Sequence, residues 1–265
     1  GTIVTKGQAI VQAAGWNNAG GILAAQRGID ATISGHLNNA QGLLRSDASL
    51  SLTNGGALSN QGGQISSTHD LSIAAATLQG GGTYSTTHDA NVHLQGDYTA
   101  VSDTQFNVGH DLAFTLPGTF TNNANLQSVN NLSVDAGNIV NAGALTAGGL
   151  LHTQSTNLTN TGALVGASAS LNATISLDKG NANLLAAGDV NVGAAMETHE
   201  LNSHETHSHS NVVSGVKIAS AIDQTMTLNR GSLVSADGVN IVSGKDVNVQ
   251  GSTLVGTNDV TLTAA

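Results

Sequence analysis

Short runs of alternating apolar and polar residues recur along this chain at a nearly constant interval. One of them is Asp70-Leu71-Ser72-Ile73, in which a turn residue is followed by apolar residues at every second position. Alternation with a period of two is typical of a β-strand that buries one face. Such runs follow one another from Gln8 to Asp189 at intervals of 18 to 22 residues, and they reappear at Gly238 and Asp259. The chain is therefore expected to repeat a unit of short strands about every 20 residues.

A second landmark lies between these runs, and it consists of an asparagine followed closely by a glycine. Asn141-Ala142-Gly143-Ala144-Leu145, for example, returns as Asn160-Thr161-Gly162-Ala163-Leu164. Asparagine tolerates left-handed turns, and identical asparagines in successive coils can hydrogen-bond to one another. The steps are 21 residues among the first three members and 19 among the last three. The predicted structural ladder comprises Asn18, Asn39, Asn60, Asn122, Asn141 and Asn160.

Strands of about four residues, very short turns and this period match one turn of a parallel β-helix. A propeller blade needs about 40 to 50 residues, and helical repeats need more than about 30. Frequent Thr, Val, Gly and Asn also disfavour helices. The predicted fold class is all-β, a right-handed parallel β-helix built as a solenoid of ~20-residue coils. At about 4.8 Å per coil, roughly a dozen coils would form a rod about 55 to 60 Å long.

The asparagine series is interrupted between Asn60 and Asn122. Five of the six aromatic residues and the only proline, Pro117, fall in this interval. We expect a wider or bulged cross-section there, and a locally larger core is favoured over a ligand groove. The five aromatic residues are Tyr84, Tyr98, Phe106, Phe114 and Phe120.

The coil pattern also lapses from Met196 to about Arg230, where two polar alternating runs surround an apolar centre. Regular coils resume at Gly231, with Gly-Ser in place of the earlier Asn-x-Gly word. We therefore expect three regions. Residues 1–195 carry first-type repeats that form β-helix coils, and residues 196–230 form a His/Thr-rich irregular junction or an extra-helical strand pair. Residues 231–265 carry second-type Gly-Ser repeats that continue the β-helix.

The composition fits a narrow aliphatic core, because 39% of the residues are hydrophobic and only 2% are aromatic. Seven scattered basic residues against 17 acidic ones give a net charge of −10 and no basic face, so nucleic acid is not an expected partner. There is no cysteine, which rules out disulfides. No apolar run approaches the roughly 20 residues of a membrane span. Gly1 begins directly in the repeat pattern, so we expect the chain to be part of a longer protein.

The sequence offers one cluster of possible metal ligands. His199, His207 and His209 would share one face of a continuous strand, and histidine is a common ligand of transition metals. His199 and His204 are five residues apart, which misses the His-Glu-x-x-His spacing of zinc proteases. A solvated face is therefore the favoured interpretation, with the three histidines as weak metal candidates.

Three histidine–aspartate pairs suggest acid–base chemistry, namely His69-Asp70, His88-Asp89 and His110-Asp111. Their recurrence at the coil period favours a turn or stacking role instead. β-Helical enzymes that cleave polysaccharides need a groove with several carboxylates, whereas the acidic residues here are spread at one or two per coil. No catalytic residue, cofactor-binding residue or cofactor is predicted, and the chain is not expected to be an enzyme.

The order of these parts resembles the filamentous haemagglutinin-type exoproteins. The Asn-x-Gly coils resemble their haemagglutinin repeats, and the Glu-Thr-His…Ser-His-Ser-Asn tract with its following Gly-Ser coils resembles their second repeat class. The resemblance implies export through an outer-membrane two-partner-secretion transporter and display at the bacterial cell surface as a right-handed parallel β-helix.

The same resemblance implies adhesion, with a receptor on a host or neighbouring bacterial cell, or contact-dependent growth inhibition through a C-terminal toxin. This chain would then be a structural shaft segment of a large secreted exoprotein. The alternative is a parallel β-helix that binds or cleaves polysaccharide.

Overall fold

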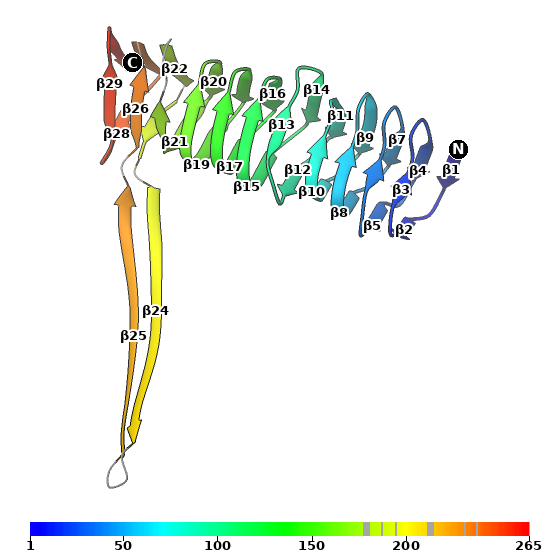
Figure 1. Ribbon diagram of the computed structural model, residues 1–265. Helices are drawn as coiled ribbons and strands as arrows, with labels where there is room; N and C mark the ends of the chain where they lie inside the picture. Colours follow the sequence, from blue (N-terminus) through cyan, green and yellow to red (C-terminus); the bar gives the residue numbers. More distant parts are fainter. Residues whose placement is uncertain are drawn as a thin grey trace.

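The computed structural model winds the chain into a stack of parallel coils, from which one long hairpin projects (Figure 1). The structure describes residues 1–176, 181–186, 188–193, 195–210, 215–230, 232–236 and 238–264. Within these ranges every regular element is a β-strand, and no helix that could cross a membrane is found among them. The all-β parallel β-helix predicted from the repeat period is therefore confirmed.

One side of every coil belongs to a sheet of 12 strands, whose neighbours all pair in parallel. These strands are four to six residues long, because turn residues follow each short alternating run. In order across the sheet they are β1 (Thr2–Thr5), β4 (Ile22–Ala25), β7 (Leu43–Ser46), β9 (Gly63–Ser67), β11 (Gly82–Thr86), β14 (Thr104–Val108), β16 (Asn125–Ser128), β18 (Ala144–Ala147), β20 (Ala163–Gly166), β22 (Asn181–Ala186), β27 (Gly238–Ser243) and β30 (Val260–Ala264).

The remaining sides of the coils form a second, 16-stranded parallel sheet. Its main path is β2 (Ala9–Ala13), β5 (Ile29–Ile33), β8 (Leu50–Ser59), β10 (Leu71–Gln79), β12 (Ala90–Leu94), β15 (Leu112–Asn122), β17 (Leu132–Asn141), β19 (Leu150–Asn160), β21 (Ser168–Ser176), β23 (Val190–Val192) and β28 (Val247–Val249). Five more strands join it off this path: β3 (Trp16–Asn17), β6 (Leu37–Asn38), β13 (Tyr98–Ala100), β26 (Leu233–Ala236) and β29 (Thr253–Gly256).

The longer strands of this sheet turn a corner midway. The pairing of β10 with β8 shifts between Ala75 and Thr77, and that of β15 with β17 shifts between Leu116 and Thr119. In the coil of β2 and β3 the same two sides are separate strands, with Gly15 between them. Each coil therefore has three sides around a narrow interior.

Alternation along each strand produces the core. In β5, Ile29, Ala31 and Ile33 are buried, whereas Asp30 and Thr32 between them are exposed. Parallel pairing without slippage places each buried residue on its counterpart in the next coil, as with Ile29 opposite Leu50. One continuous hydrophobic cluster consequently runs from Ala9 to Ile241.

Aromatic side chains fill the core between Asn60 and Asn122. Tyr84 stacks on Phe106 with ring centres 4.5 Å apart, and Phe114 contacts Phe106 at 5.1 Å and Phe120 at 5.0 Å. All five aromatic residues of this interval are at most 1% exposed. Burial raises the pKa of the Tyr84 and Tyr98 hydroxyls, so both remain neutral. These residues form a locally larger core rather than a surface groove.

The hairpin consists of β24 (Ala195–Ser210) and β25 (Gly215–Arg230), which pair antiparallel with Ala195 opposite Arg230. It follows β23 and precedes β26, yet β22 pairs with β27 and β23 pairs with β28 in register across it. The hairpin is thus inserted at a corner within one coil, and the stack continues beyond it. Figure 1 shows the two strands, in yellow and orange, extending away from the coils.

The aromatic core yields a stability prediction. Phe114→Ala removes a fully buried ring that contacts Tyr98, Phe106 and Phe120, so we expect the free energy of unfolding to fall by about 3–5 kcal/mol. The matched control Val129→Ala trims a side chain that is 69% exposed and should change it by less than about 0.5 kcal/mol. Urea denaturation followed by circular dichroism measures both variants. Equal losses in the two would contradict the proposed role of the aromatic core.

Candidate functional site

Two rows of polar side chains run along the stack, and the first lies inside it. The Asn18 Nδ2 donates to Asn39 Oδ1, and the Asn39 Nδ2 donates to Asn60 Oδ1, both at 2.7 Å. Asn122, Asn141 and Asn160 are joined in the same way, again at 2.7 Å. All six predicted ladder residues are buried, with at most 8% of their surface exposed. The structure thus places them in two hydrogen-bonded ladders of three residues each.

Each ladder residue also closes its own turn. The Asn39 Nδ2 lies 3.3 Å from the Gly42 carbonyl oxygen, and the Gly42 N–H donates to the Asn39 carbonyl oxygen at 2.9 Å. A Cβ added at Gly63, the equivalent of Gly42 in the next coil, would collide with the carbonyl oxygen of Asn39. The glycine of the repeated word is therefore required by the close approach of one coil to the next.

The turns of the two ladders differ in length by one residue. In each turn of the first ladder, a residue with positive φ precedes that glycine. These residues are Gly20 at 60°, Gln41 at 55° and Gly62 at 60°. In the second ladder the asparagine Nδ2 donates to the carbonyl oxygen two residues ahead, as from Asn141 to Gly143. The first ladder ends at Asn60, because the next coil has no asparagine at this position to accept from its Nδ2. The aromatic core begins directly after it.

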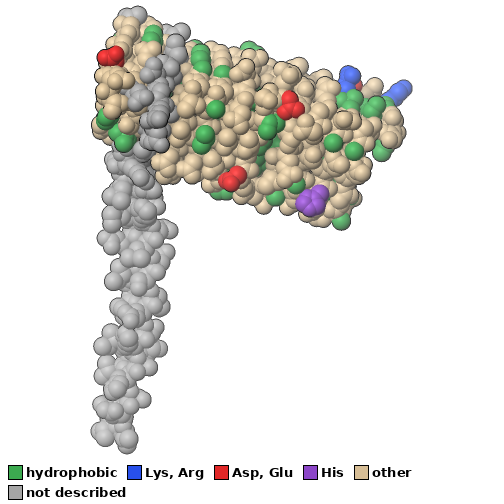
Figure 2. All heavy atoms as spheres, turned by 45° about the horizontal axis from the view of Figure 1, so that its top comes forward, with side chains coloured by type: hydrophobic (Ala, Val, Ile, Leu, Met, Phe, Trp, Pro, Cys, Tyr) green, Lys and Arg blue, Asp and Glu red, His purple; other side chains and the backbone are tan. Residues whose placement is uncertain are grey.

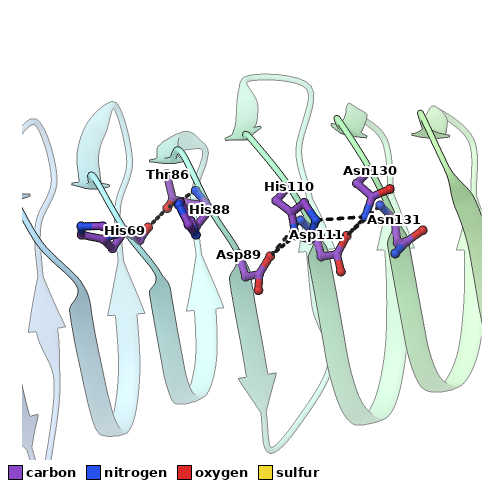
Figure 3. Close-up of polar contacts among 8 residues, drawn as sticks. All are labelled: His69, Thr86, His88, Asp89, His110, Asp111, Asn130 and Asn131. Carbon is purple, nitrogen blue, oxygen red and sulfur yellow. Dashed lines mark hydrogen bonds and ion pairs between the residues drawn. The ribbon is translucent and has the colours of Figure 1, made fainter.

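The second row lies on the outer corner between the first and second sides of the coils (Figure 3). We call the residues His69, Asp70, His88, Asp89, His110 and Asp111 the His/Asp corner. Threonines support this corner, because Thr86 Oγ1 donates to the carbonyl oxygen of His69 and accepts from the N–H of His88. The rings of His69 and His88 meet edge to face, with centres 5.4 Å apart.

The carboxylates of the His/Asp corner bind the backbone of the next coil. Asp89 Oδ1 accepts the Asp111 N–H at 3.1 Å, and Asp111 Oδ1 accepts the Asn131 N–H at 2.9 Å. Asn131 continues the series, because its Oδ1 accepts the Leu150 N–H at 2.9 Å. These side chains therefore act as a turn device that repeats from coil to coil, which is the role that their period predicted.

The ion pair at this corner joins two coils rather than two sequence neighbours. His110 Nδ1 lies 2.7 Å from Asp89 Oδ1 in the preceding coil but 3.7 Å from Asp111 Oδ1. The bond to Asp89 raises the pKa of His110, and the bonds from His110 and the Asp111 N–H lower the pKa of Asp89. Both side chains are exposed, at 56% and 42%. The sequence singled out the dipeptides but missed this pairing, which the 21-residue separation could have revealed.

An open hollow of about 510 Å³ adjoins the His/Asp corner. None of its lining residues is ionisable, so the hollow offers no pair of acid and base. They are Thr86, Thr87, Asn107, Val108, Gly109, Gln127, Ser128 and Val129. On the face shown in Figure 2, charged and histidine side chains are few and are spread over a mostly uncharged surface.

The weak metal candidates His199, His207 and His209 belong to strand β24. Their register opposite β25 is Met226, Ile218 and Val216, respectively. Their side chains lie outside the described part of the structure, so a metal site there stays a prediction.

Comparison with known sequences identifies the repeats. A sequence profile described as haemagglutinin repeat matches residues 1–62, 29–112, 103–194 and 212–265. The chain belongs to the haemagglutinin repeat family. This confirms the resemblance inferred from the order of the repeats, and it places the chain among secreted proteins that are displayed at the bacterial cell surface.

Part of this chain is also similar to named proteins of one bacterial species. Over 95 residues, or 36% of this chain, the sequence is 68% identical to tRNA nuclease CdiA-2 of Burkholderia pseudomallei strain 1026b. Over 95 residues it is also 53% identical to two proteins of Burkholderia pseudomallei named tRNA nuclease CdiA. The chain spans only 3%, 8% and 7% of the lengths of these relatives. No solved structure matches the chain.

The ladder of these haemagglutinin repeats can be tested at Asn141. Asn141→Leu would leave the buried amide partners Asn122 and Asn160 incompletely bonded, so the free energy of unfolding should fall by about 1–3 kcal/mol. Asn125→Leu is the matched control, because Asn125 is exposed on β16. Urea denaturation of both variants gives the comparison, and a control that loses as much stability as Asn141→Leu would refute the ladder's contribution.

The His110–Asp89 pair should make stability depend on pH. The raised His110 pKa stabilises the fold below its ordinary value of 6.5, and this contribution is lost as pH rises through the folded-state pKa. The lowered Asp89 pKa stabilises above its ordinary value of 3.8, and that contribution is lost as pH falls through the folded-state pKa. Both contributions are present between these two values.

We therefore expect His110→Gln to lower the thermal midpoint more at pH 5.5 than at pH 9, measured in low salt with a chelator. The control His93→Gln replaces an exposed histidine on β12 and should show no such difference. A His110→Gln effect that is the same at both pH values would contradict the pairing.

Proposed function

We propose that these haemagglutinin repeats form a shaft segment of a large secreted exoprotein, which acts in adhesion or in contact-dependent delivery of a C-terminal toxin. The observation that carries this proposal is the unbroken order of parallel strands from β1 to β30. Such a stack gains roughly 4.8 Å in length with each coil, so its natural role is to set distance. The family membership of the chain supports the same role.

The proposed mechanism is mechanical. Each coil that folds buries the open apolar face of the coil before it, so folding can proceed one coil at a time outside the cell. The free energy released there helps to draw the chain outward through an outer-membrane transporter of the two-partner-secretion type. A receptor on a host or neighbouring bacterial cell is then contacted by other parts of the exoprotein.

We also propose the threefold division of the chain into first-type coils over 1–195, a junction over 196–230 and second-type coils over 231–265. The insertion of β24 and β25 within a single coil supports this division, because paired coils lie on either side of it. The junction is thereby available to a partner without breaking the shaft.

We propose that this region has no enzymatic activity of its own. Asp89 and Asp111 accept backbone N–H groups across coils, which is a structural use of a carboxylate. The relatives are named tRNA nucleases, but the part shared with this chain is a small share of their length, so we assign that activity to other regions of such proteins. A polysaccharide-cleaving or polysaccharide-binding role is less well supported, because the hollow beside the His/Asp corner has no ionisable lining residue.

A deletion of one period tests the shaft role in the full exoprotein. Removing residues 141–159 joins Val140 to Asn160 and deletes one 19-residue step of the ladder. We expect surface display, and adhesion to or inhibition of target cells, to persist within about twofold, because the coils above and below can restack in register. Removing residues 141–150 instead deletes about half a coil, and it should abolish a protease-resistant shaft.

Flow cytometry with an antibody to the distal end measures display, and co-culture measures adhesion or inhibition. Normal display with lost target-cell activity after the one-period deletion would show that these coils carry a binding site, which contradicts the shaft role. Turnover of polygalacturonate or another glycan by the purified chain would instead favour the enzyme alternative.

A further inference from the structure

Three side chains of the His/Asp corner are arranged as ligands of a single ion. Asp89 comes from one coil, and His110 and Asp111 come from the next. Each offers one ligand atom, and these atoms all lie within 4.8 Å of one another. We propose that Asp89, His110 and Asp111 bind a divalent transition-metal ion such as Zn²⁺.

The separations of His110 Nδ1 from the two carboxylates lie on either side of the ligand spacing around such an ion. His110 Nδ1 lies 2.7 Å from Asp89 Oδ1 and 3.7 Å from Asp111 Oδ1. Ligand atoms that bind Zn²⁺ tetrahedrally with bonds of about 2.0–2.2 Å are about 3.4 Å apart, a value between these two distances. Rotation of the two carboxylates that turns each Oδ2 toward His110 Nδ1 would convert the ion pair into a three-ligand site, in which the metal ion takes the place of the proton on His110 Nδ1.

Free coordination positions remain on both carboxylates. Asp89 and Asp111 use Oδ1 for the backbone N–H groups of the next coil, and no hydrogen bond involves the Oδ2 of either among the described residues. Asn130 further fixes Asp111, because its Nδ2 donates to Asp111 Oδ1 at 2.8 Å. The backbone bonds thus hold the ligands in place before a metal arrives, which lowers the entropic cost of binding.

The ligand set selects the class of metal. One imidazole and two carboxylates suit Zn²⁺ and its neighbours, whereas Ca²⁺ requires six to eight oxygen ligands. The two carboxylates neutralise the charge of the ion, and the neutral imidazole supplies the third bond. The three side chains are 37% to 56% exposed, which leaves a fourth position for water.

The location gives the ion a role. Both coils that supply ligands lie between Asn60 and Asn122, where the interior asparagine ladder is interrupted. A metal bound there would tie Asp89 of one coil to His110 and Asp111 of the next from the outside. It would cross-link the coils that lack hydrogen bonds between asparagine side chains in the core.

The test is isothermal titration of ZnCl₂ into the chain without a purification tag. The four histidines His199, His204, His207 and His209 are first replaced by alanine, so that they cannot contribute. We expect saturable binding at one site per chain, a weakening of at least about tenfold in both His110→Ala and Asp111→Asn, and no response to CaCl₂. His69→Gln, on the same corner, is the matched control and should bind within about twofold of the parent.

A second measurement guards against misfolding. The amide oxygen of Asp111→Asn can still accept the Asn131 N–H, so this variant should keep its strand content by circular dichroism. Zn²⁺ should raise the thermal midpoint of the parent and of His69→Gln, reversibly with a chelator, but not that of Asp111→Asn. The proposal is overturned if Zn²⁺ does not bind saturably, or if the folded His110→Ala and Asp111→Asn variants bind it as tightly as the parent.

Discussion

The structure depends on one constraint, the register of parallel strands from coil to coil. When each residue lies on its counterpart in the next coil, the identity of the neighbour is decided by the period of the sequence alone. Ile29 then meets Leu50, and Asn18 meets Asn39, without any long-range search. A slip of one residue would turn every buried side chain of a strand toward solvent. Register is therefore protected at several places along the stack.

Two of these places are polar, and they work in different surroundings. Inside the stack, amide-to-amide bonds join both polar groups of Asn39 and Asn141 to other asparagines, and this offsets the cost of burying them. Outside it, the carboxylates of Asp89 and Asp111 hold the backbone of the following coil while remaining accessible to water. The interior bonds are strong because water is excluded, whereas the exterior corner stays open to protons and ions. The stack thus carries an interior structural row, and a chemically responsive outer row where the interior row is interrupted.

Much of this could be predicted from the sequence, because local patterns and the tertiary structure share one period. The alternation in Leu71-Ser72-Ile73 predicted the strand, and the steps of 21 and 19 residues predicted which asparagines could stack. The pairing of His110 with Asp89 was missed, although their separation of 21 residues is one coil. Coil length varies in that region, so adjacency along the chain suggested Asp111 as the partner, and only the three-dimensional register brings Asp89 closer. The metal-ligand geometry follows from that unpredicted pairing.

The aromatic core acquires a further meaning from the two lengths of coil on either side of it. Before Tyr84 the ladder repeats every 21 residues, and after Phe120 it repeats every 19, so the perimeter of the rod changes within three coils. Hydrogen bonds between asparagine side chains require a narrow range of distances, so the ladder could not continue across such a change in coil length. Offset and edge-on rings tolerate a range of separations, from 4.5 to 5.8 Å here. The aromatic segment therefore joins coils of two different lengths into one continuous solenoid.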